Sequence, residues 1–324
     1  LIGLPASRRP AWLAALLAER TEEGYYAHLR FTPPQTLLSV RSPIAAHGRL
    51  RTVAHGPWRV LWFDGVEQGM TCHQPGGALI PTAVGFDYQR TMVAAAAALG
   101  MPAAPSAAPS APPSAVAAAA APTSRPRRPY RVLLVGLGAG SCAAATAALL
   151  APHAAEVIAV ENDPAVVHAA ETAHGVRIER IGASCPGAER SAAAVAGREG
   201  GKKGGRSGRA RSQSASSARA EGTAPPEAAV RVVLSDAAAY IASLPPGSVD
   251  CVLLDAYDAK GHVPAHLQAA PFLSALGGCL AAGATAIANL WHGTPAARAA
   301  SDAFVATFAS ATGADTFALR VVGH

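Results

Sequence analysis

Cysteine is scarce in this chain, and its few cysteines form no pattern typical of a metal site. The 324 residues include five cysteines, with no C-x-x-C pair among them: Cys72, Cys142, Cys185, Cys251 and Cys279. An odd, scattered set argues against a disulfide framework or a structural zinc site and suits a reducing compartment, cytoplasmic or plastid. We therefore expect no bound metal. Cys142, Cys251 and Cys279 lie within apolar runs and are expected in the core.

The chain also lacks a long run of Leu, Ile, Val and Phe. Hydrophobic residues make up 50% of the sequence, but alanine inflates that share, and aromatic residues reach only 5%. The alanine-rich run after Met92 is interrupted by Pro102 and further prolines. No segment predicts a membrane span, so no membrane partner is expected. No targeting segment is visible, and the first residue is Leu1 rather than Met, as in a fragment of a longer protein.

Positive charge is concentrated in one segment. The Gly-, Ser- and Arg-rich stretch over 183–229 contains eight Lys or Arg and four Glu, so it supplies +4 of the formal net charge of +6. The rest of the chain is nearly neutral, which makes the basic balance poor evidence for a nucleic-acid partner. The composition of the 183–229 stretch cannot bury much apolar surface and predicts a disordered surface insertion.

Composition divides the chain into three parts. Residues 1–100 are expected to form a small β-containing domain, with a hairpin of Leu50–Ala54 and Trp58–Phe63 around His55-Gly56-Pro57 and a helix over Gln89–Leu99. Residues 101–129 are an Ala- and Pro-rich linker. Residues 130–324 form the third part, which carries the basic insertion.

Strand-like and helix-like segments alternate in this third part. Such alternation predicts an α/β fold, a Rossmann-like doubly wound and mostly parallel sheet with helices on both faces. The expected strands are Val132–Val135, Val157–Val160, Val230–Leu234, Val249–Leu254, Thr285–Leu290 and Thr316–Val321. The expected helices are Ser141–Leu150, Pro164–His174, Ala265–Leu280 and Ala296–Ala311.

The most informative stretch runs from Val132 to Glu161. An apolar strand ends in a loop with Gly136, Gly138 and Gly140, a small-residue helix follows, and a second strand ends on Glu161. Glycines let the backbone approach a ligand closely, and an acid about twenty residues later can take both hydroxyls of a ribose. The G-x-G-x-G spacing differs from that of dinucleotide enzymes and favours a nucleoside of the S-adenosylmethionine type. A tight turn without a ligand is the alternative.

Further acids follow the next strands. Ser235-Asp236 ends the third expected strand, and Asp255-Ala256-Tyr257-Asp258 ends the fourth. In open α/β sheets, ligands bind beyond the carboxyl ends of the strands. Asp236 lies just before a short helix and could act mainly as its cap. Glu161 and Asp255 directly follow apolar runs, and capping explains them less well.

At these residues the chain resembles the polyamine aminopropyltransferases, the spermidine synthase family, and within it a divergent spermidine-synthase-like branch. The similarity covers about Ser42 to Phe86 and Arg131 to the end, without the two low-complexity stretches. The matching motifs are Leu61-x-x-Asp64-Gly65-x-x-Gln68, the glycine loop, Glu161-x-Asp163-Pro164, Asp236-Ala237, the D-x-x-D loop from Asp255 to Asp258, and Pro264-x-x-Leu267.

The resemblance implies a methyltransferase-type fold and a co-substrate, decarboxylated S-adenosylmethionine. It implies that Glu161 holds the ribose, that Asp236 and Ala237 lie near the adenine, and that Gln68 contacts the nucleoside. The implied activity is transfer of an aminopropyl group to a small-molecule amine. Such an amine must lose a proton to attack, so a carboxylate base is needed. We expect Asp255 to be this base, and Tyr257 and Asp258 to orient the amine.

The sequence also departs from the family. Ala139 stands in the glycine loop where the synthases have an acid, Arg90 follows the Phe86-Asp87-Tyr88 stretch, and Ala259 replaces a proline. An S-adenosylmethionine-dependent methyltransferase with another acceptor therefore stays an alternative. A non-catalytic nucleoside-binding homologue is a third. The acceptor, and whether the protein forms a homodimer, are left open.

Overall fold

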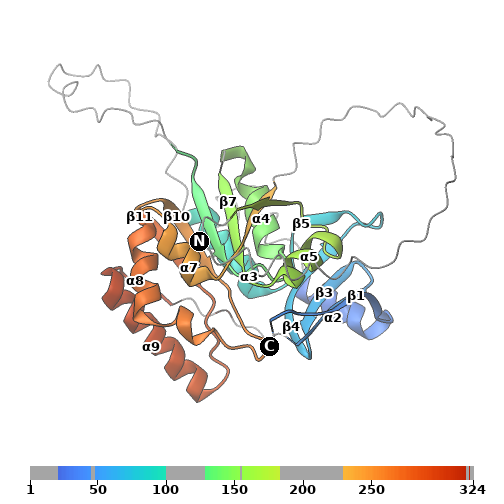
Figure 1. Cartoon of the computed structure of the whole chain (residues 1–324). Helices are drawn as coiled ribbons and strands as arrows, with labels where there is room; N and C mark the ends of the chain where they lie inside the picture. The colour runs from blue at the N-terminus through green and yellow to red at the C-terminus, as the bar shows by residue number, and fades with distance from the viewer. Residues whose placement is uncertain are drawn as a thin grey trace, which may run out of the picture.

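Two β-sheets, one antiparallel and one parallel, lie at the centre of the molecule (Figure 1). The computed structural model describes residues 21–44, 48–99, 128–153, 155–182, 229–318 and 321. Apart from residues 128 and 129, the expected linker lies outside the described residues. So does the expected basic insertion, apart from residue 229.

The N-terminal sheet is a five-stranded antiparallel meander. Its strands pair in chain order: β1 (Gln35–Arg41), β2 (Arg49–His55), β3 (Trp58–Phe63), β4 (Val66–His73) and β5 (Leu79–Val84). The expected hairpin is confirmed as β2 and β3, and Gly56 adopts a positive φ of 60° in its turn. Helix α2 (Thr21–Phe31) covers one face of the sheet, where Tyr25 is fully buried among Trp58, Val60 and Met70.

The second sheet has six strands, all of its pairs are parallel, and it follows the order β11-β10-β6-β7-β9-β8. Its strands are β6 (Arg131–Val135), β7 (Glu156–Glu161), β8 (Ile178–Ile181), β9 (Val230–Leu234), β10 (Val249–Leu254) and β11 (Leu280–Ala288). After β6, the chain adds β7, β8 and β9 on one side of this strand, and it later adds β10 and β11 on the other side. The switch point of the sheet therefore lies between β6 and β10.

Alternating residues of the central strand supply two cores. Val132 and Leu134 of β6 belong to one cluster, whereas Leu133 and Val135 belong to the other. The first face is covered by α3 (Asp87–Leu99), α4 (Ser141–Leu150), the short η4 (Ala151–His153) and α5 (Pro164–Thr172). The other is covered by α7 (Ala237–Ser243), η5 (Ala265–Leu267), α8 (Ala270–Cys279) and α9 (Pro295–Thr312) (Figure 1). This doubly wound arrangement confirms the expected α/β class.

The two sheets share the first of these two hydrophobic cores. Helix α3 follows the N-terminal sheet in the sequence, yet it packs on α4 and on strands β10 and β11. The cluster on this side combines residues of both sheets, including Leu50, Leu61, Val132 and Leu134. Cys142, Cys251 and Cys279 are buried as expected. Side chains of one sheet are therefore held at fixed positions relative to the other sheet.

Some expected elements are corrected. Residues 316–318 belong to no strand: the segment does not pair with β11, an edge strand of the parallel sheet, and the Phe317 side chain is 93% exposed. The expected helix over 265–280 is divided into η5 and α8, and Pro271 lies in the first turn of α8, where a missing N–H costs nothing. Strand β11 begins at Leu280 rather than at Thr285.

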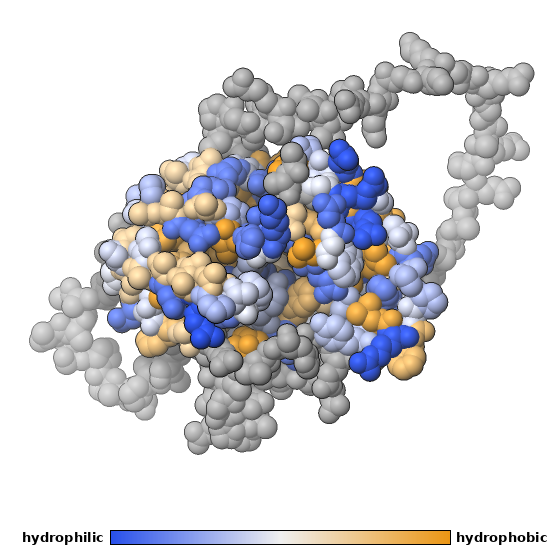
Figure 2. Space-filling model, turned by 90° about the horizontal axis from the view of Figure 1, so that it is seen from below, coloured by the Kyte–Doolittle hydropathy of each residue, from blue (hydrophilic) through white to orange (hydrophobic). Residues whose placement is uncertain are grey.

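Apolar side chains on the surface are dispersed. Among the described residues, the exposed large hydrophobic side chains are Tyr26, Phe31, Leu37, Trp291 and Phe317. Figure 2 shows hydrophilic and hydrophobic residues interspersed over the coloured part of one face. None of the described helices is both long enough and apolar enough to cross a bilayer.

Candidate active site at the switch point of the parallel sheet

A cavity of about 420 Å³ lies at the carboxyl edge of the parallel sheet, beside the start of β4. This volume suits a small-molecule ligand. Eight of the residues expected from the sequence line it: Gln68, Gly136, Gly138, Glu161, Asp236, Ala237, Asp255 and Tyr257. Gly140 and Asp258 are not among its lining residues. The cavity thus brings five strand ends of the parallel sheet, those of β6, β7, β9, β10 and β11, together with a strand of the other sheet.

The glycine loop after β6 is held close to two other segments. Gly136 has a φ of 95°, and a Cβ built on it would lie 2.5 Å from the carbonyl oxygen of Asp255. Gly138 has a φ of 53°, and its Cβ would lie 2.9 Å from the carbonyl oxygen of Gln68. Only glycine allows both contacts. A Cβ on Gly140 would instead meet Val176, so this glycine serves the packing at the start of α4.

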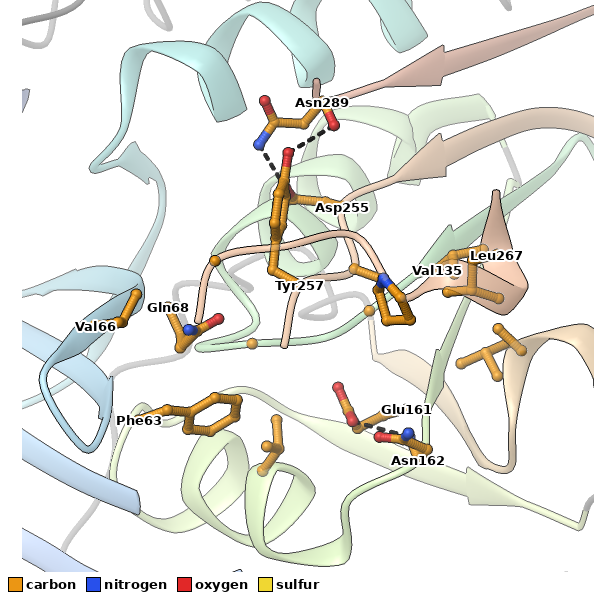
Figure 3. Close-up of a pocket in the computed structure, with 18 of the residues that line it drawn as sticks. Phe63, Val66, Gln68, Val135, Glu161, Asn162, Asp255, Tyr257, Leu267 and Asn289 are labelled. Carbon is orange, nitrogen blue, oxygen red and sulfur yellow. Dashed lines mark hydrogen bonds between the residues drawn. The ribbon is translucent and has the colours of Figure 1, made fainter. Parts of the chain in front are cut away.

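Glu161, at the end of β7, is tied to the backbone around it. Its Oε2 accepts a hydrogen bond from the N–H of Leu137 at 3.0 Å, and its Oε1 accepts from the N–H groups of Asn162 and Asp163, both at 2.9 Å. The side chain is only 8% exposed and faces the cavity (Figure 3). The carboxylate therefore fixes the glycine loop against the end of β7, in addition to its expected contact with a ribose.

Asp236, at the end of β9, has two partners. Its Oδ1 accepts from the N–H of Ala239 at 3.0 Å and caps α7, as the capping interpretation predicts. Its Oδ2 lies 3.0 Å from Nε2 of His266, which also lines the cavity. Asp236 is thus both a helix cap and a cavity-lining carboxylate.

Asp255, at the end of β10, is held between two side-chain amides. Nδ2 of Asn289 donates to its Oδ1 at 3.0 Å, and Nε2 of Gln89 donates to its Oδ2 at 3.2 Å. The hydroxyl of Ser141 donates to Oε1 of Gln89 at 2.8 Å, which orients that amide. Burial raises the pKa of Asp255, and the two amide bonds act in the opposite direction. A raised pKa suits a carboxylate that must accept a proton.

Two tyrosines lie next to Asp255. The hydroxyl of Tyr257 donates to the carbonyl oxygen of Asn289 at 2.7 Å (Figure 3). Burial, and then the neighbouring Asp255, raise the pKa of both Tyr257 and Tyr88. Both phenols therefore remain protonated. Both tyrosines line the cavity and add polar groups to its wall.

The carboxylate of Asp258 is directed into its own loop. Its Oδ1 accepts from the N–H groups of Lys260 and His262, at 2.8 and 2.9 Å. Its backbone carbonyl accepts from Nε2 of Gln68 at 3.4 Å. In this arrangement Asp258 shapes the loop and connects it to β4, while the expected contact with an amine stays a prediction.

Four residues of the site were not singled out from the sequence as functional: Ser141, Gln89, Lys260 and Asn289. Asn289 directly follows β11, so the strand-end rule applied to that strand would have indicated it. Gln89 lies on α3, and no pattern in the sequence connects it to Asp255, 166 residues away. No cluster of three or more potential metal ligands occurs among the described residues.

No protein-family model and no curated protein matches this sequence. Among solved structures, the chain is similar to a probable spermidine synthase from Corynebacterium glutamicum, with 14% identity and a TM-score of 0.40 over 76% of this chain and 60% of that one. It is also similar to a spermidine synthase in complex with the transition-state analogue AdoDATO, with 14% identity and a TM-score of 0.40 over 76% of this chain and 55% of that one. The chain thus spans less than two thirds of both structures.

Proposed function

We propose that this chain is a transferase of the aminopropyltransferase type. It binds decarboxylated S-adenosylmethionine in a methyltransferase-type fold and transfers the aminopropyl group to a small-molecule amine. The observation that carries the proposal is Asp255, a half-buried carboxylate held by Gln89 and Asn289 in the same cavity as the glycine loop and Glu161. This combination offers a nucleoside site and a base side by side.

The charges of the cavity support a cationic co-substrate. Decarboxylated S-adenosylmethionine carries a sulfonium and an ammonium group. Glu161, Asp236 and Asp255 line the cavity, whereas Lys260 is the one Lys or Arg among its described lining residues. In the proposed complex Glu161 accepts from the ribose hydroxyls, Asp236 and Ala237 lie at the base, and Gln68 contacts the nucleoside. Such charge-assisted hydrogen bonds are shorter and stronger than neutral ones.

The proposed reaction is a displacement at carbon. The nitrogen of the acceptor amine forms a bond to the propyl methylene beside the sulfonium, the carbon–sulfur bond breaks, and methylthioadenosine leaves with that electron pair. The proton lost by the amine passes to Asp255. Alignment of the two reactants makes the displacement effectively unimolecular, and a positioned base typically contributes about 10²–10⁴-fold.

A methyltransferase is the second candidate, and Ala139 favours it. This residue is 1% exposed and packs near Gly69, so the glycine loop offers no acid for the ammonium of the decarboxylated co-substrate. The two activities release different nucleosides. Aminopropyl transfer releases methylthioadenosine, whereas methyl transfer releases S-adenosylhomocysteine.

The test incubates the protein with each co-substrate and a panel of amines and identifies the nucleoside product. Methylthioadenosine formed only from decarboxylated S-adenosylmethionine, and only with an amine present, is the expected result. S-adenosylhomocysteine from ordinary S-adenosylmethionine would replace the proposal by the methyltransferase. Nucleoside binding without either product would leave a non-catalytic homologue.

A further inference from the structure

Asp255 is the carboxylate assigned to the reacting nitrogen, and the other charges around the cavity bear on the class of amine that the site accepts. This inference rests on the proposed function. A diamine carries two ammonium groups. One loses a proton and reacts, and the other needs an acid at the far end of the bound diamine. Glu67 lines the cavity, and Asp87 and Asp258 are sequence neighbours of its lining residues Tyr88 and Tyr257.

Asp87 is already paired. It lies in the first turn of α3, and its Oδ1 accepts from Nη1 of Arg90 at 2.9 Å. Neither residue lines the cavity, although their neighbour Tyr88 does. The pair is neutral in sum, so this region offers little attraction to a distal ammonium.

Glu67 lines the cavity, and its carboxylate is engaged by Tyr25. Its Oε1 accepts from the hydroxyl of Tyr25 at 2.7 Å. Tyr25 belongs to α2, which covers the face of the antiparallel sheet opposite to the parallel sheet. The charge of Glu67 is thus directed to that face, where it raises the pKa of Tyr25 further above the value set by burial.

The loop of Asp258 presents a positive charge instead of a negative one. The Asp258 carboxylate caps the N–H groups of Lys260 and His262, as described above. Lys260 lines the cavity, and its ammonium makes no ion pair with any acid of the described chain. Lys260 belongs to the same loop as Asp255, the proposed base, and this loop contacts Gln68 of β4 through the Asp258 carbonyl.

We propose that the acceptor is an amino acid-type amine, with one reactive ammonium group and a carboxylate at its far end. Asp255 serves the reacting nitrogen, and Lys260 pairs with the distal carboxylate. A diamine of the same length would bring its second ammonium to Lys260, which repels it. Like charges placed together penalise the wrong partner strongly.

Three amines with the same four-carbon chain test this proposal. Putrescine ends in a second ammonium, butylamine in a methyl group and 4-aminobutyrate in a carboxylate. With decarboxylated S-adenosylmethionine as donor, we expect kcat/KM for methylthioadenosine release to be at least tenfold higher with 4-aminobutyrate than with putrescine, and butylamine to be intermediate. A kcat/KM for putrescine that equals or exceeds that for 4-aminobutyrate overturns the inference and leaves the proposed transferase standing.

A charge reversal gives a second, independent arm. Lys260→Glu should invert the order of putrescine and 4-aminobutyrate, whereas Arg41→Glu, the same charge change on exposed strand β1, should keep the wild-type order. An unchanged order in Lys260→Glu contradicts the role of Lys260.

If no amine releases methylthioadenosine, the proposed function itself fails. Calorimetry on protein saturated with methylthioadenosine then decides the binding class. Preferred binding of 4-aminobutyrate over putrescine supports the acceptor inference, and preferred or equal binding of putrescine, or of neither amine, overturns it.

Discussion

The proposed nucleoside half and the proposed acceptor half of the cavity hold their carboxylates in different ways. In the nucleoside half, Glu161 and Asp236 accept from backbone N–H groups of neighbouring residues. In the acceptor half, Asp255 accepts from two side-chain amides that come from α3 and from the end of β11. A group tied to the backbone contributes to the fold as well as to binding. A group held by side chains can be altered with little effect on the fold, so its loss should affect the chemistry alone.

The largest effect is expected at Asp255. Asp255→Asn keeps the size of the side chain but removes the base, so kcat should fall by about 10²–10⁴-fold with a smaller change in KM. Methylthioadenosine binding should be retained. Asp302→Asn, an exposed aspartate on α9, is the matched control. Full activity of Asp255→Asn in a steady-state assay would show that another group takes the proton.

The nucleoside half should respond differently at Glu161. Glu161→Ala removes a charged acceptor from the ribose and should weaken methylthioadenosine binding by about 1.5–3 kcal/mol. It also leaves the N–H groups of Leu137, Asn162 and Asp163 without this partner, so the melting temperature should fall as well. Glu179→Ala on β8 is an exposed control. Calorimetry and thermal unfolding check both effects, and a change in only one would separate the two roles.

Acid should destabilise the contact between the antiparallel sheet and the segment that follows α5. His174 is fully buried, with Nε2 at 3.1 Å from the Thr52 hydroxyl and Nδ1 at 2.8 Å from the Thr71 hydroxyl, and burial lowers its pKa to about 3. As the pH falls below about 6.5, the unfolded chain binds a proton at this residue and the native chain does not. The free energy of unfolding should therefore drop by about 2 kcal/mol between pH 7 and pH 5 from this residue.

His174→Gln removes this titration, so its stability should depend less on pH over the same range. His153→Gln, at an exposed position in η4, should keep the wild-type slope. Denaturant unfolding at pH 7, 6 and 5 measures both slopes. Equal slopes in the wild type and in His174→Gln would mean that His174 is not held neutral in the native protein.

A smaller effect is expected when Asp255 loses one of the two side-chain amides that donate to it. The Asn289 side chain opposes the rise of the Asp255 pKa that burial causes, so Asn289→Ala should raise that pKa further. The acid limb of the pH–rate profile should then move to higher pH, with activity lost at neutral pH by on the order of tenfold and recovered in more alkaline buffer. The Tyr257 hydroxyl donates to the backbone carbonyl of Asn289, so this substitution does not remove that hydrogen bond. A uniform loss at every pH would indicate misfolding rather than a shifted pKa.

The smallest effect is expected from deleting the basic segment over 184–226. Strands β8 and β9 pair in parallel, with Ile178 opposite Val230 and Ile181 opposite Val233. A connection from the end of β8 to the start of β9 must return about 10 Å along the sheet, which eight Gly and Ser residues can span. The melting temperature and the methylthioadenosine affinity should stay nearly unchanged. A large loss of stability would show that the segment packs on the domain.

Local patterns in the sequence were enough to predict the parallel sheet and the residues at its strand ends that line the cavity. The glycine loop, Glu161 and Asp236 each belong to a strand followed by its own turn, so nearby residues identify them. The acceptor half is assembled from distant segments. Gln89, Ser141 and Asn289 meet Asp255 only because α3 packs on α4 and on the edge of the parallel sheet. Strand β8 was not predicted because its four residues are too short to show an alternation, and helix α2 was not predicted either.

The central claim is that the cavity is built for the decarboxylated co-substrate. Decarboxylated and ordinary S-adenosylmethionine differ by one carboxylate, which would enter a cavity whose acids outnumber its Lys and Arg. Calorimetric titration of the wild-type protein with both compounds compares them directly. The account predicts that the decarboxylated compound binds at least tenfold more tightly, about 1.4 kcal/mol. Equal affinity, or tighter binding of ordinary S-adenosylmethionine, would contradict it and favour the methyltransferase.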